Sequence, residues 1–288
     1  YTVTLVVTNQ GNVIDSIKKT VTVNPNPSTN FSRSNTCEGV STSFTNSSSI
    51  GSGSITGYVW NFGDGNKSSS TSPSHTYQNN GNFDVKLVAT SDKGCMDSVT
   101  KAITIFDQPS ADFSVSAVCL GQSVNFTNSS SISTGSISYV WKFGDGFSST
   151  QKNPSYTYSS SGTYTVTLIA TSNRGCIDSI SKSLTIDPKP TAAFNASDEC
   201  SNVDISFNNT STITAGTLSY LWDFGDNTNS TAVSPDHKYA TPGSYAVKLK
   251  VTSNKGCLDS VTKTVKSLPA PVANFTIPSP CSGTKLTF

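Results

Sequence analysis

The feature that most constrains the fold of this chain is an aromatic segment that occurs three times at a constant spacing. The copies are YVWNFGDG at residues 58–65, YVWKFGDG at 139–146 and YLWDFGDN at 220–227. The only tryptophans of the chain lie in them, 81 residues apart: Trp60, Trp141 and Trp222. Strand side chains alternate between two faces, so the Tyr, Trp and Phe rings of a copy share one face, and the glycine and aspartate that follow supply a turn. This period predicts one β unit repeated in tandem, with its tryptophan in the core.

The same period divides the chain into repeats and linkers. Full repeats are expected at residues 31–105, 111–186 and 192–267, with the C-terminal part of a repeat at 1–23 and the N-terminal part of another at 273–288. The linkers, at 24–30, 106–110, 187–191 and 268–272, all contain proline, which removes a ladder donor and stiffens the path. Both ends fall inside a repeat, so we expect the chain to belong to a longer array.

The second repeat shows the strand pattern most clearly. Strands are expected at 111–116, 123–128, around Trp141, after the Gly-Asp-Gly turn, at 153–158, from Gly162, and through Ile180 to Ile186. No window of the sequence has a sustained helical period. About seven short strands in some 75 residues, separated by turn residues, predict a β-sandwich.

Composition and charge exclude several classes of function. The net charge is +1 and only 13% of residues are charged, so there is no basic stripe for nucleic acid. No apolar run approaches the roughly 20 residues that membrane insertion needs. The seven cysteines form no CxxC pair, which argues against zinc. A Ser- and Thr-rich β protein with regularly placed cysteines is typical of the extracellular space.

Three motifs together indicate a family. The W-x-F-G-D-G strand, the upstream Phe126–Ser129 and the downstream Tyr158 to Tyr164 resemble those of the PKD domain, an immunoglobulin-like module. The resemblance implies an all-β fold of tandem sandwiches arranged end to end as a rod. The Gly-Cys-x-Asp-Ser of residues 175–179 is similar to a variant in very large secreted Bacteroidota proteins, which type IX secretion exports as adhesins or surface filaments. PKD domains also serve as spacers in secreted hydrolases, and fold alone does not decide between these roles.

The turn aspartates Asp64, Asp145 and Asp226 are the candidate metal ligands. The resemblance allows calcium, which some PKD domains bind. Calcium needs several oxygen ligands, however, and a single acid recurs here. We therefore favour a turn aspartate that bonds its own backbone, with no metal or other cofactor.

Catalysis has no candidate residues in the sequence. His75 and His237 occupy equivalent positions, but Tyr156 stands there in the second repeat, which predicts aromatic packing and not a ligand or base. No serine has a plausible histidine base with an acid to orient it. We expect a protein that is not an enzyme.

An Asp-Ser-aliphatic motif follows the same turn in every repeat. It resembles the Bacteroidota O-glycosylation signal, which would make glycan acceptors of Ser16, Ser98, Ser179 and Ser260. The alternative is a turn exit in which the aspartate accepts backbone N–H bonds. The two interpretations are compatible.

The cysteines occupy two places in the repeat. Cys37, Cys119, Cys200 and Cys281 lie in the A–B turn, between the first two strands, while Cys95, Cys176 and Cys257 lie in the F–G turn, between the last two. In an immunoglobulin-like sandwich strands B and F run the same way, which separates the two turns of one repeat by roughly 25 Å. A disulfide needs Cα atoms within about 7 Å.

We therefore predict bridges that cross the junctions, Cys37 with Cys176 and Cys119 with Cys257. Cys95, Cys200 and Cys281 would then pair with repeats outside this chain, and Val13 leaves one F–G turn without a cysteine. Pairing within a repeat, such as Cys119 with Cys176, and free thiols remain alternatives.

These expectations describe a structural stalk or filament segment of a long cell-surface protein. Its partners would be other repeats of the same chain, lateral copies of itself in a fibre and, weakly, surface polysaccharide, with no nucleic acid and no inserted membrane. The alternatives are an array of carbohydrate-binding modules, which needs a row of exposed aromatic rings, and a spacer in a secreted hydrolase.

Overall fold

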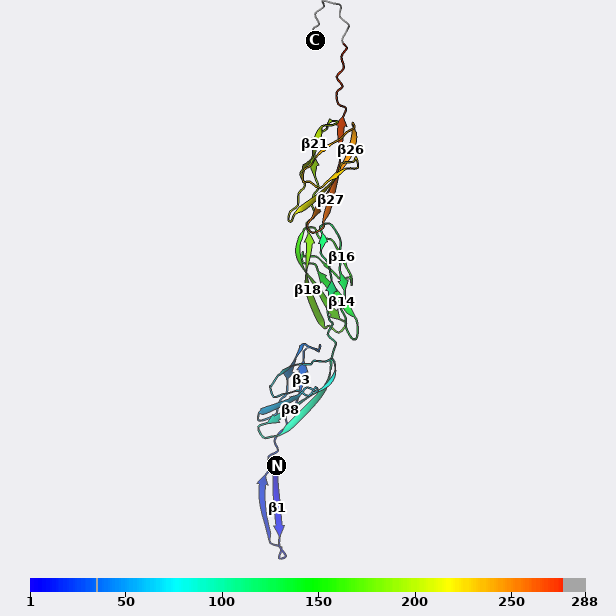
Figure 1. Ribbon diagram of the computed structural model, residues 1–288. Coiled ribbons are helices and arrows are strands. Elements are labelled where there is room, and N and C mark those ends of the chain that lie inside the picture. The colour runs from blue at the N-terminus through cyan, green and yellow to red at the C-terminus, as the bar shows by residue number, and fades with distance from the viewer. Residues whose placement is uncertain (35, 277–288) are drawn as a thin grey trace, which may run out of the picture.

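The computed structural model of the protein describes residues 1–34 and 36–276, which form a hairpin and three β-sandwiches in one elongated row (Figure 1). The described residues contain no helix, and so none that could cross a membrane. The first sandwich is inclined to the line of the second and third. The all-β expectation and the tandem arrangement are confirmed.

Each sandwich is built from short strands in the same order along the chain. The N-terminal hairpin pairs β1 (Thr2–Thr8) with β2 (Ile14–Thr20). The strands of the first repeat are β3 (Phe31–Arg33), β4 (Ser41–Asn46), β5 (Ile55–Asn61), β6 (Lys67–Ser68), β7 (Ser74–Thr76), β8 (Gly81–Ser91) and β9 (Met96–Ile105).

The second and third repeats have nine strands each. Those of the second are β10 (Phe113–Ser114), β11 (Val118–Cys119), β12 (Val124–Asn125), β13 (Thr127–Asn128), β14 (Ile137–Lys142), β15 (Ser148–Ser149), β16 (Ser155–Tyr156), β17 (Gly162–Ser172) and β18 (Ile177–Asp187). Those of the third are β19 (Phe194–Asn195), β20 (Glu199–Cys200), β21 (Asp204–Ser206), β22 (Asn208–Asn209), β23 (Leu218–Asp223), β24 (Asn229–Ser230), β25 (Asp236–Lys238), β26 (Gly243–Ser253) and β27 (Leu258–Leu268).

Two layers face each other in every sandwich. In the second repeat the larger sheet has the order β11-β18-β17-β14-β15, and the pairs β10-β13 and β12-β16 form the opposite layer. The third repeat has the same order. The first strand, expected at 111–116, is divided between the layers, since β10 pairs with β13 while β11 crosses over to run parallel to β18. Strand A is therefore attached to both sheets.

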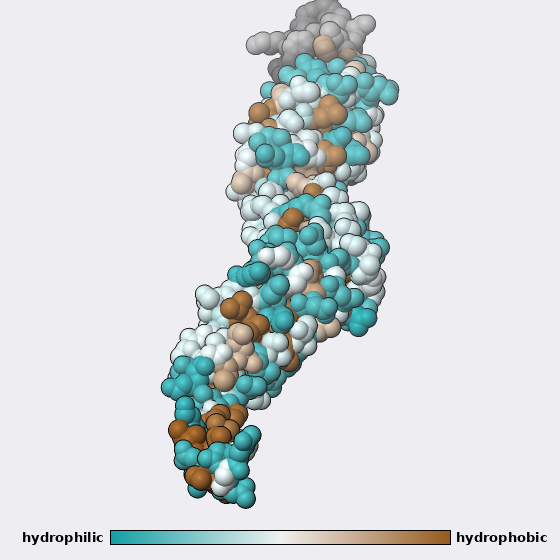
Figure 2. All heavy atoms as spheres, turned by 90° about the horizontal axis from the view of Figure 1, so that it is seen from below, coloured by the Kyte–Doolittle hydropathy of each residue, from teal (hydrophilic) through white to brown (hydrophobic). Residues whose placement is uncertain are grey.

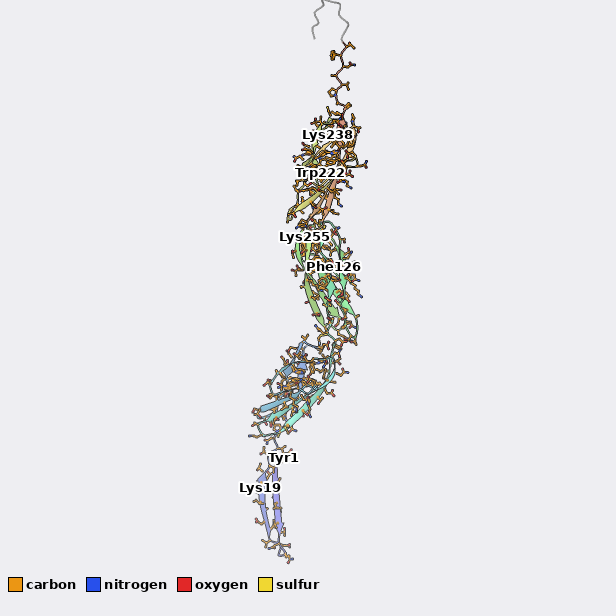
Figure 3. The ribbon with its side chains drawn as sticks, viewed as in Figure 1. Tyr1, Lys19, Phe126, Trp222, Lys238 and Lys255 are labelled. Carbon is orange, nitrogen blue, oxygen red and sulfur yellow. A yellow bond between two sulfur atoms is a disulfide. The ribbon has the colours of Figure 1, made fainter. Side chains whose placement is uncertain are left out.

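The repeated tryptophan is the centre of each core. Trp60, Trp141 and Trp222 are fully buried, and each indole N–H donates to a backbone carbonyl at 2.9–3.0 Å. The ring of Trp141 packs against Phe113 at 5.0 Å and Phe126 at 5.4 Å, one from each of the first two strand regions. Edge and tilted contacts of this kind add to the stability that burial supplies. Figure 3 shows Phe126 and Trp222 inside the second and third sandwiches.

A buried tyrosine closes the end of each core. The hydroxyls of Tyr77, Tyr158 and Tyr239 donate to the carbonyls of Phe62, Phe143 and Phe224 at 2.8–3.0 Å. Burial, with the nearby turn aspartate, raises the pKa of each of these tyrosines, so the hydroxyl remains a donor. The bond joins the chain before strand F to the end of the tryptophan strand.

An inward-facing lysine covers the open edge of each sandwich. Lys101, Lys182 and Lys263 lie 4.9–5.2 Å from the rings of Phe31, Phe113 and Phe194 and donate to the carbonyls of the same phenylalanines. The contact links the last strand to the first one, in the opposite layer. A cation over a ring face is stabilising, and the aliphatic stem also covers apolar surface.

The hairpin carries its apolar side chains on the surface. Every residue from 1 to 23 is exposed, including Val3, Leu5, Val7 and Ile17, although these were expected to be half-buried. Figure 2 shows apolar residues gathered at this end of the molecule. The side chains are exposed because the described residues provide no second layer to cover them.

The first glycine of the turn after the tryptophan strand is the tightest point of the fold. Gly144 has φ of +89°, and a Cβ there would lie 2.6 Å from the carbonyl oxygen of Thr165. Gly146, two residues later, has φ of +97° with open space around it. The two glycines therefore separate backbone strain from a steric clash.

We predict that Gly144→Ala destabilises the second repeat by at least about 2 kcal/mol more than Gly146→Ala, which carries only the strain of positive φ, about 1–2 kcal/mol. Hydrogen exchange of the β14 and β17 amides measures this repeat alone. Equal protection in the two variants would show that strand F yields to the added methyl group.

Candidate functional site: the bridged domain junctions

Two disulfides cross the junctions between neighbouring sandwiches. Cys37 of the first repeat is joined to Cys176 of the second with Cα atoms 5.7 Å apart, and Cys119 of the second to Cys257 of the third at 5.6 Å. These are the pairs that the strand directions predict. Cys95 and Cys200 have no disulfide partner among the described residues, and Cys281 lies outside them.

The A–B cysteine is held at the far end of its repeat by the last strand. Cys119 is the last residue of β11, opposite Asp187 at the end of β18, and Leu120 N donates to Asp187 O at 2.8 Å. In the first repeat Cys37 makes the equivalent parallel bridge to Phe106. The cysteine therefore sits where its repeat ends and the linker begins.

The F–G cysteine is fixed at the near end of the following repeat. Buried Ser172 and Ser253 close the F–G turn, and each Oγ accepts the backbone N–H of Cys176 or Cys257 at 3.1 Å. Figure 3 shows Lys255, in the same turn as Cys257, between the second and third sandwiches. The two turns that carry cysteine thus meet across each junction.

The aspartate of the Asp-Ser motif fastens the linker that enters its own repeat. Asp97, Asp178 and Asp259 accept the backbone N–H of Thr29, Ala111 and Ala192 at 2.7–2.9 Å. This hydrogen bond lowers the pKa of Asp97, and with the Lys189 ammonium it lowers the pKa of Asp259. The sequence predicted an acceptor of backbone N–H bonds here but not that its partner lies some 67 residues away.

The linkers are docked against their neighbours. Ser28, Ser110 and Thr191 each form an isolated antiparallel bridge within the repeat they enter, with Ser49, Ser131 and Thr212. Each bridge has a pair of backbone hydrogen bonds of 2.7–3.0 Å. A linker tied down in this way restricts the bending that a free segment of five residues would permit.

The first bridged junction carries a polar network of its own. Its linker has Asp107 where the next one has Pro188, and the Asp107 carboxylate is buried and accepts a hydrogen bond from the Thr134 hydroxyl. Gln108 donates through Nε2 to Ile177 O at 2.5 Å. The Arg174 guanidinium lies 5.3 Å from the Phe106 ring. These contacts join residues of both sandwiches beside the Cys37–Cys176 bridge.

The second bridged junction uses charge instead. Lys189, between the two prolines of its linker, forms an ion pair with Asp259 at 3.2 Å, and both side chains are partly exposed. An exposed pair of this kind contributes at most about 1 kcal/mol. The disulfide and the backbone bridge therefore carry most of the connection here.

The candidate metal ligands are engaged by the protein. Asp64, Asp145 and Asp226 each accept the N–H of the residue two positions later through Oδ1, at 3.0–3.2 Å. Their second oxygens bond His75, Tyr156 and His237 at 2.6–2.8 Å. The described residues contain no cluster of three or more His, Cys, Asp or Glu side chains suited to a metal.

The pKa of the turn aspartates follows from these partners. Burial raises the pKa of Asp64 and Asp226, but the hydrogen bonds from the imidazole and from the turn residues outweigh it, so the net direction is down. In the second repeat burial, and then the bond to Asp145, raise the pKa of Tyr156 to about 12. All three turns are held by an ionised aspartate at neutral pH.

His75, Tyr156 and His237 have one role in packing. Their rings stack on Phe62, Phe143 and Phe224 with centroids 4.1–4.3 Å apart and planes within 7°. The two histidines and the tyrosine thus each combine a stacked ring with a donor to the turn aspartate. Ser16, Ser98, Ser179 and Ser260, the candidate glycan acceptors, are exposed.

We predict that His75→Tyr changes the free energy of unfolding of the first repeat by less than about 1 kcal/mol, because the second repeat shows that tyrosine preserves both contacts. His75→Ala removes the stacked ring and one partner of Asp64 and should cost about 1–3 kcal/mol. Hydrogen exchange of the β5 and β8 amides reads this repeat. Equal effects of Tyr and Ala would refute the shared role.

Comparison with known proteins agrees with this architecture. A microbial collagenase of Vibrio alginolyticus is 42% identical over 65 residues, covering 23% of this chain and 8% of the collagenase. The pre-pro-metalloprotease PrtV of Vibrio cholerae is 37% identical over 102 residues, covering 33% of this chain and 11% of the protease. The chain thus spans about a tenth of the length of these relatives.

The fold and the family follow from two further matches. The N-terminal eight immunoglobulin domains of Down syndrome cell adhesion molecule align with 93% of this chain and 39% of their own, with a TM-score of 0.52 and 11% identity, which shows the fold alone. The family model described as PKD domain matches residues 22–106, 107–188 and 187–267. The chain therefore belongs to the PKD domain family and contains three such domains in tandem.

Proposed function

We propose that this chain is a non-catalytic stalk segment of a long extracellular protein, a cell-surface adhesin or the body of a surface filament. The observation that carries the proposal is the pair of disulfides that cross successive junctions. A bridge inside a domain would stabilise only that domain. A bridge between domains restricts their relative motion, which matters where the domains must hold a fixed length.

The dimensions suit this role. Strand β18 has 11 residues, about 36 Å at 3.3 Å per residue, so each repeat with its loops adds roughly 35–45 Å to the stalk. Every junction has a docked linker in addition to any disulfide. The array thus places whatever it carries at a defined distance from its attachment point. Export by the type IX route belongs to this proposal.

A second candidate is a spacer within a secreted hydrolase. It is favoured by the relatives, which are a collagenase and a metalloprotease whose similarity to this chain is confined to a small part of their length. The two candidates assign the same mechanical task to the repeats. They differ in what the stalk carries, so the sequence of the whole protein separates them.

A carbohydrate-binding array has less support. Its rows of stacking rings would have to come from the recurring tryptophans, and all three are buried. We keep weak contact with surface polysaccharide, lateral association with other copies, and pairing of Cys95, Cys200 and Cys281 with further repeats as parts of the stalk proposal.

Small-angle X-ray scattering tests the stalk directly. A compact globule of this length would have a radius of gyration of about 19 Å. We predict a value at least about twice as large, and a broader spread of inter-domain angles in electron micrographs once all four bridging cysteines are replaced by serine. A compact particle, or identical angles with and without bridges, would contradict the proposal.

We also propose that Ser16, Ser98, Ser179 and Ser260 carry O-linked glycans. The support is that all four are exposed and lie on outer strands, next to an aspartate fixed by its own strand or by the linker. Intact-mass measurement of protein from its native host should show additional hexose-type mass, which the four Ser→Ala replacements remove. The bare polypeptide mass would dispose of the proposal.

A further inference from the structure

The two disulfides interleave along the chain. Cys119, which begins the second bridge, lies inside the loop that Cys37 and Cys176 close, and Cys176 lies inside the loop of Cys119 and Cys257. Between the bridges, residues 37–119 and residues 176–257 form the two sides of one covalent ring. Bridges within single domains would instead give separate loops in series.

Interleaving changes the path along which tension passes. A path that crosses from Cys37 to Cys176 omits a separation of 139 residues, and one that crosses from Cys119 to Cys257 omits 138. No path from one end to the other uses both bridges, because each begins inside the other's loop. The two shortest covalent paths are therefore alternatives of nearly equal length.

We propose that the crossed disulfides give the stalk a redundant covalent path, so that neither the unfolding of a domain nor a single break of the backbone between Cys37 and Cys257 separates its ends. This inference rests on the proposed stalk function, since it matters for a chain that carries tension. A cut in the first repeat is bypassed through Cys37–Cys176. A cut in the third is bypassed through Cys119–Cys257, and a cut in the second through either one.

The spacing of the cysteines is suited to such a path. From an F–G cysteine to the next A–B cysteine the chain has 24 residues in every case, Cys95 to Cys119 and Cys176 to Cys200 among the described ones. These residues form the last strand of one repeat, the linker and the first strand of the next. Fully extended they reach roughly 80–86 Å, close to the length of two repeats at 35–45 Å each. The segment is therefore nearly taut in the folded chain.

The test uses one specific protease site inserted into an exposed loop of the full chain. The first variant carries the site in loop 69–72, between β6 and β7, and the second in loop 231–234, between β24 and β25. After cleavage both proteins should migrate as one covalent species on a non-reducing gel and as two fragments after reduction. Bridges within single repeats would release two fragments from both variants without reduction.

Removing one bridge at a time provides matched controls. Cys37→Ser with Cys176→Ser should make the cut in the first repeat separating and leave the cut in the third harmless. Cys119→Ser with Cys257→Ser should do the opposite. Tryptophan fluorescence of each uncut protein confirms folding, and the unreplaced oxidised chain decides the question even if a variant does not fold. Any other pattern of fragments overturns the proposal.

Stretching single molecules by their two ends gives the second measurement. Loss of either bridge alone should leave the fully extended length unchanged to within about one residue. Loss of both should lengthen it by about 139 residues, roughly 450–500 Å. Lengthening in two additive steps would overturn the redundant path. Because scattering measures shape without tension, that failure would leave the rod itself intact.

Discussion

The direction of the strands is the constraint on which the junctions depend. In this sandwich the A–B turn and the F–G turn lie at opposite ends, since strand A ends beside the end of the last strand and the F–G turn lies where that strand starts. Two cysteines in these turns cannot meet within one domain. They can meet only across a junction, so the fold of one domain determines how neighbouring domains are connected.

That constraint holds only if each small domain keeps its shape. A repeat of about 75 residues buries a modest share of its surface and is marginal alone. The core is therefore aromatic, with a buried tryptophan, a tyrosine bonded to a backbone carbonyl, and a lysine over a phenylalanine ring at the open edge. The same contacts recur in each repeat. Such contacts are individually small, but they position the turns that carry the cysteines.

Much of this was predictable because it depends on local periodicity. The alternation of Tyr, Trp and Phe predicted the buried face, and the strand directions predicted both bridges before any coordinates were considered. The contacts of Asp107 with Thr134 and of Gln108 with Ile177 were not predictable, because they join residues that approach only when two domains dock. The division of strand A between two sheets was also missed, since a break of three residues leaves no mark on the alternation.

The linkers show why equal spacing does not give equal junctions. Asp107 replaces the first proline of the motif, and it is buried with a hydroxyl partner, whereas the next linker keeps both prolines and exposes Lys189. The sandwiches on either side of Asp107 are inclined to each other, while those around Lys189 are more nearly in line (Figure 1). A single position in the linker thus accompanies a change of direction in the stalk.

The separation of 139 residues between Cys37 and Cys176 has a consequence for biosynthesis. During synthesis Cys95 emerges long before Cys176 and is the first thiol with which Cys37 could combine. Once the first repeat has folded, the two are held at opposite ends and cannot react. Correct oxidation therefore requires that each domain fold before its thiols are consumed, and the finished tertiary structure acts as the template that selects the right partner.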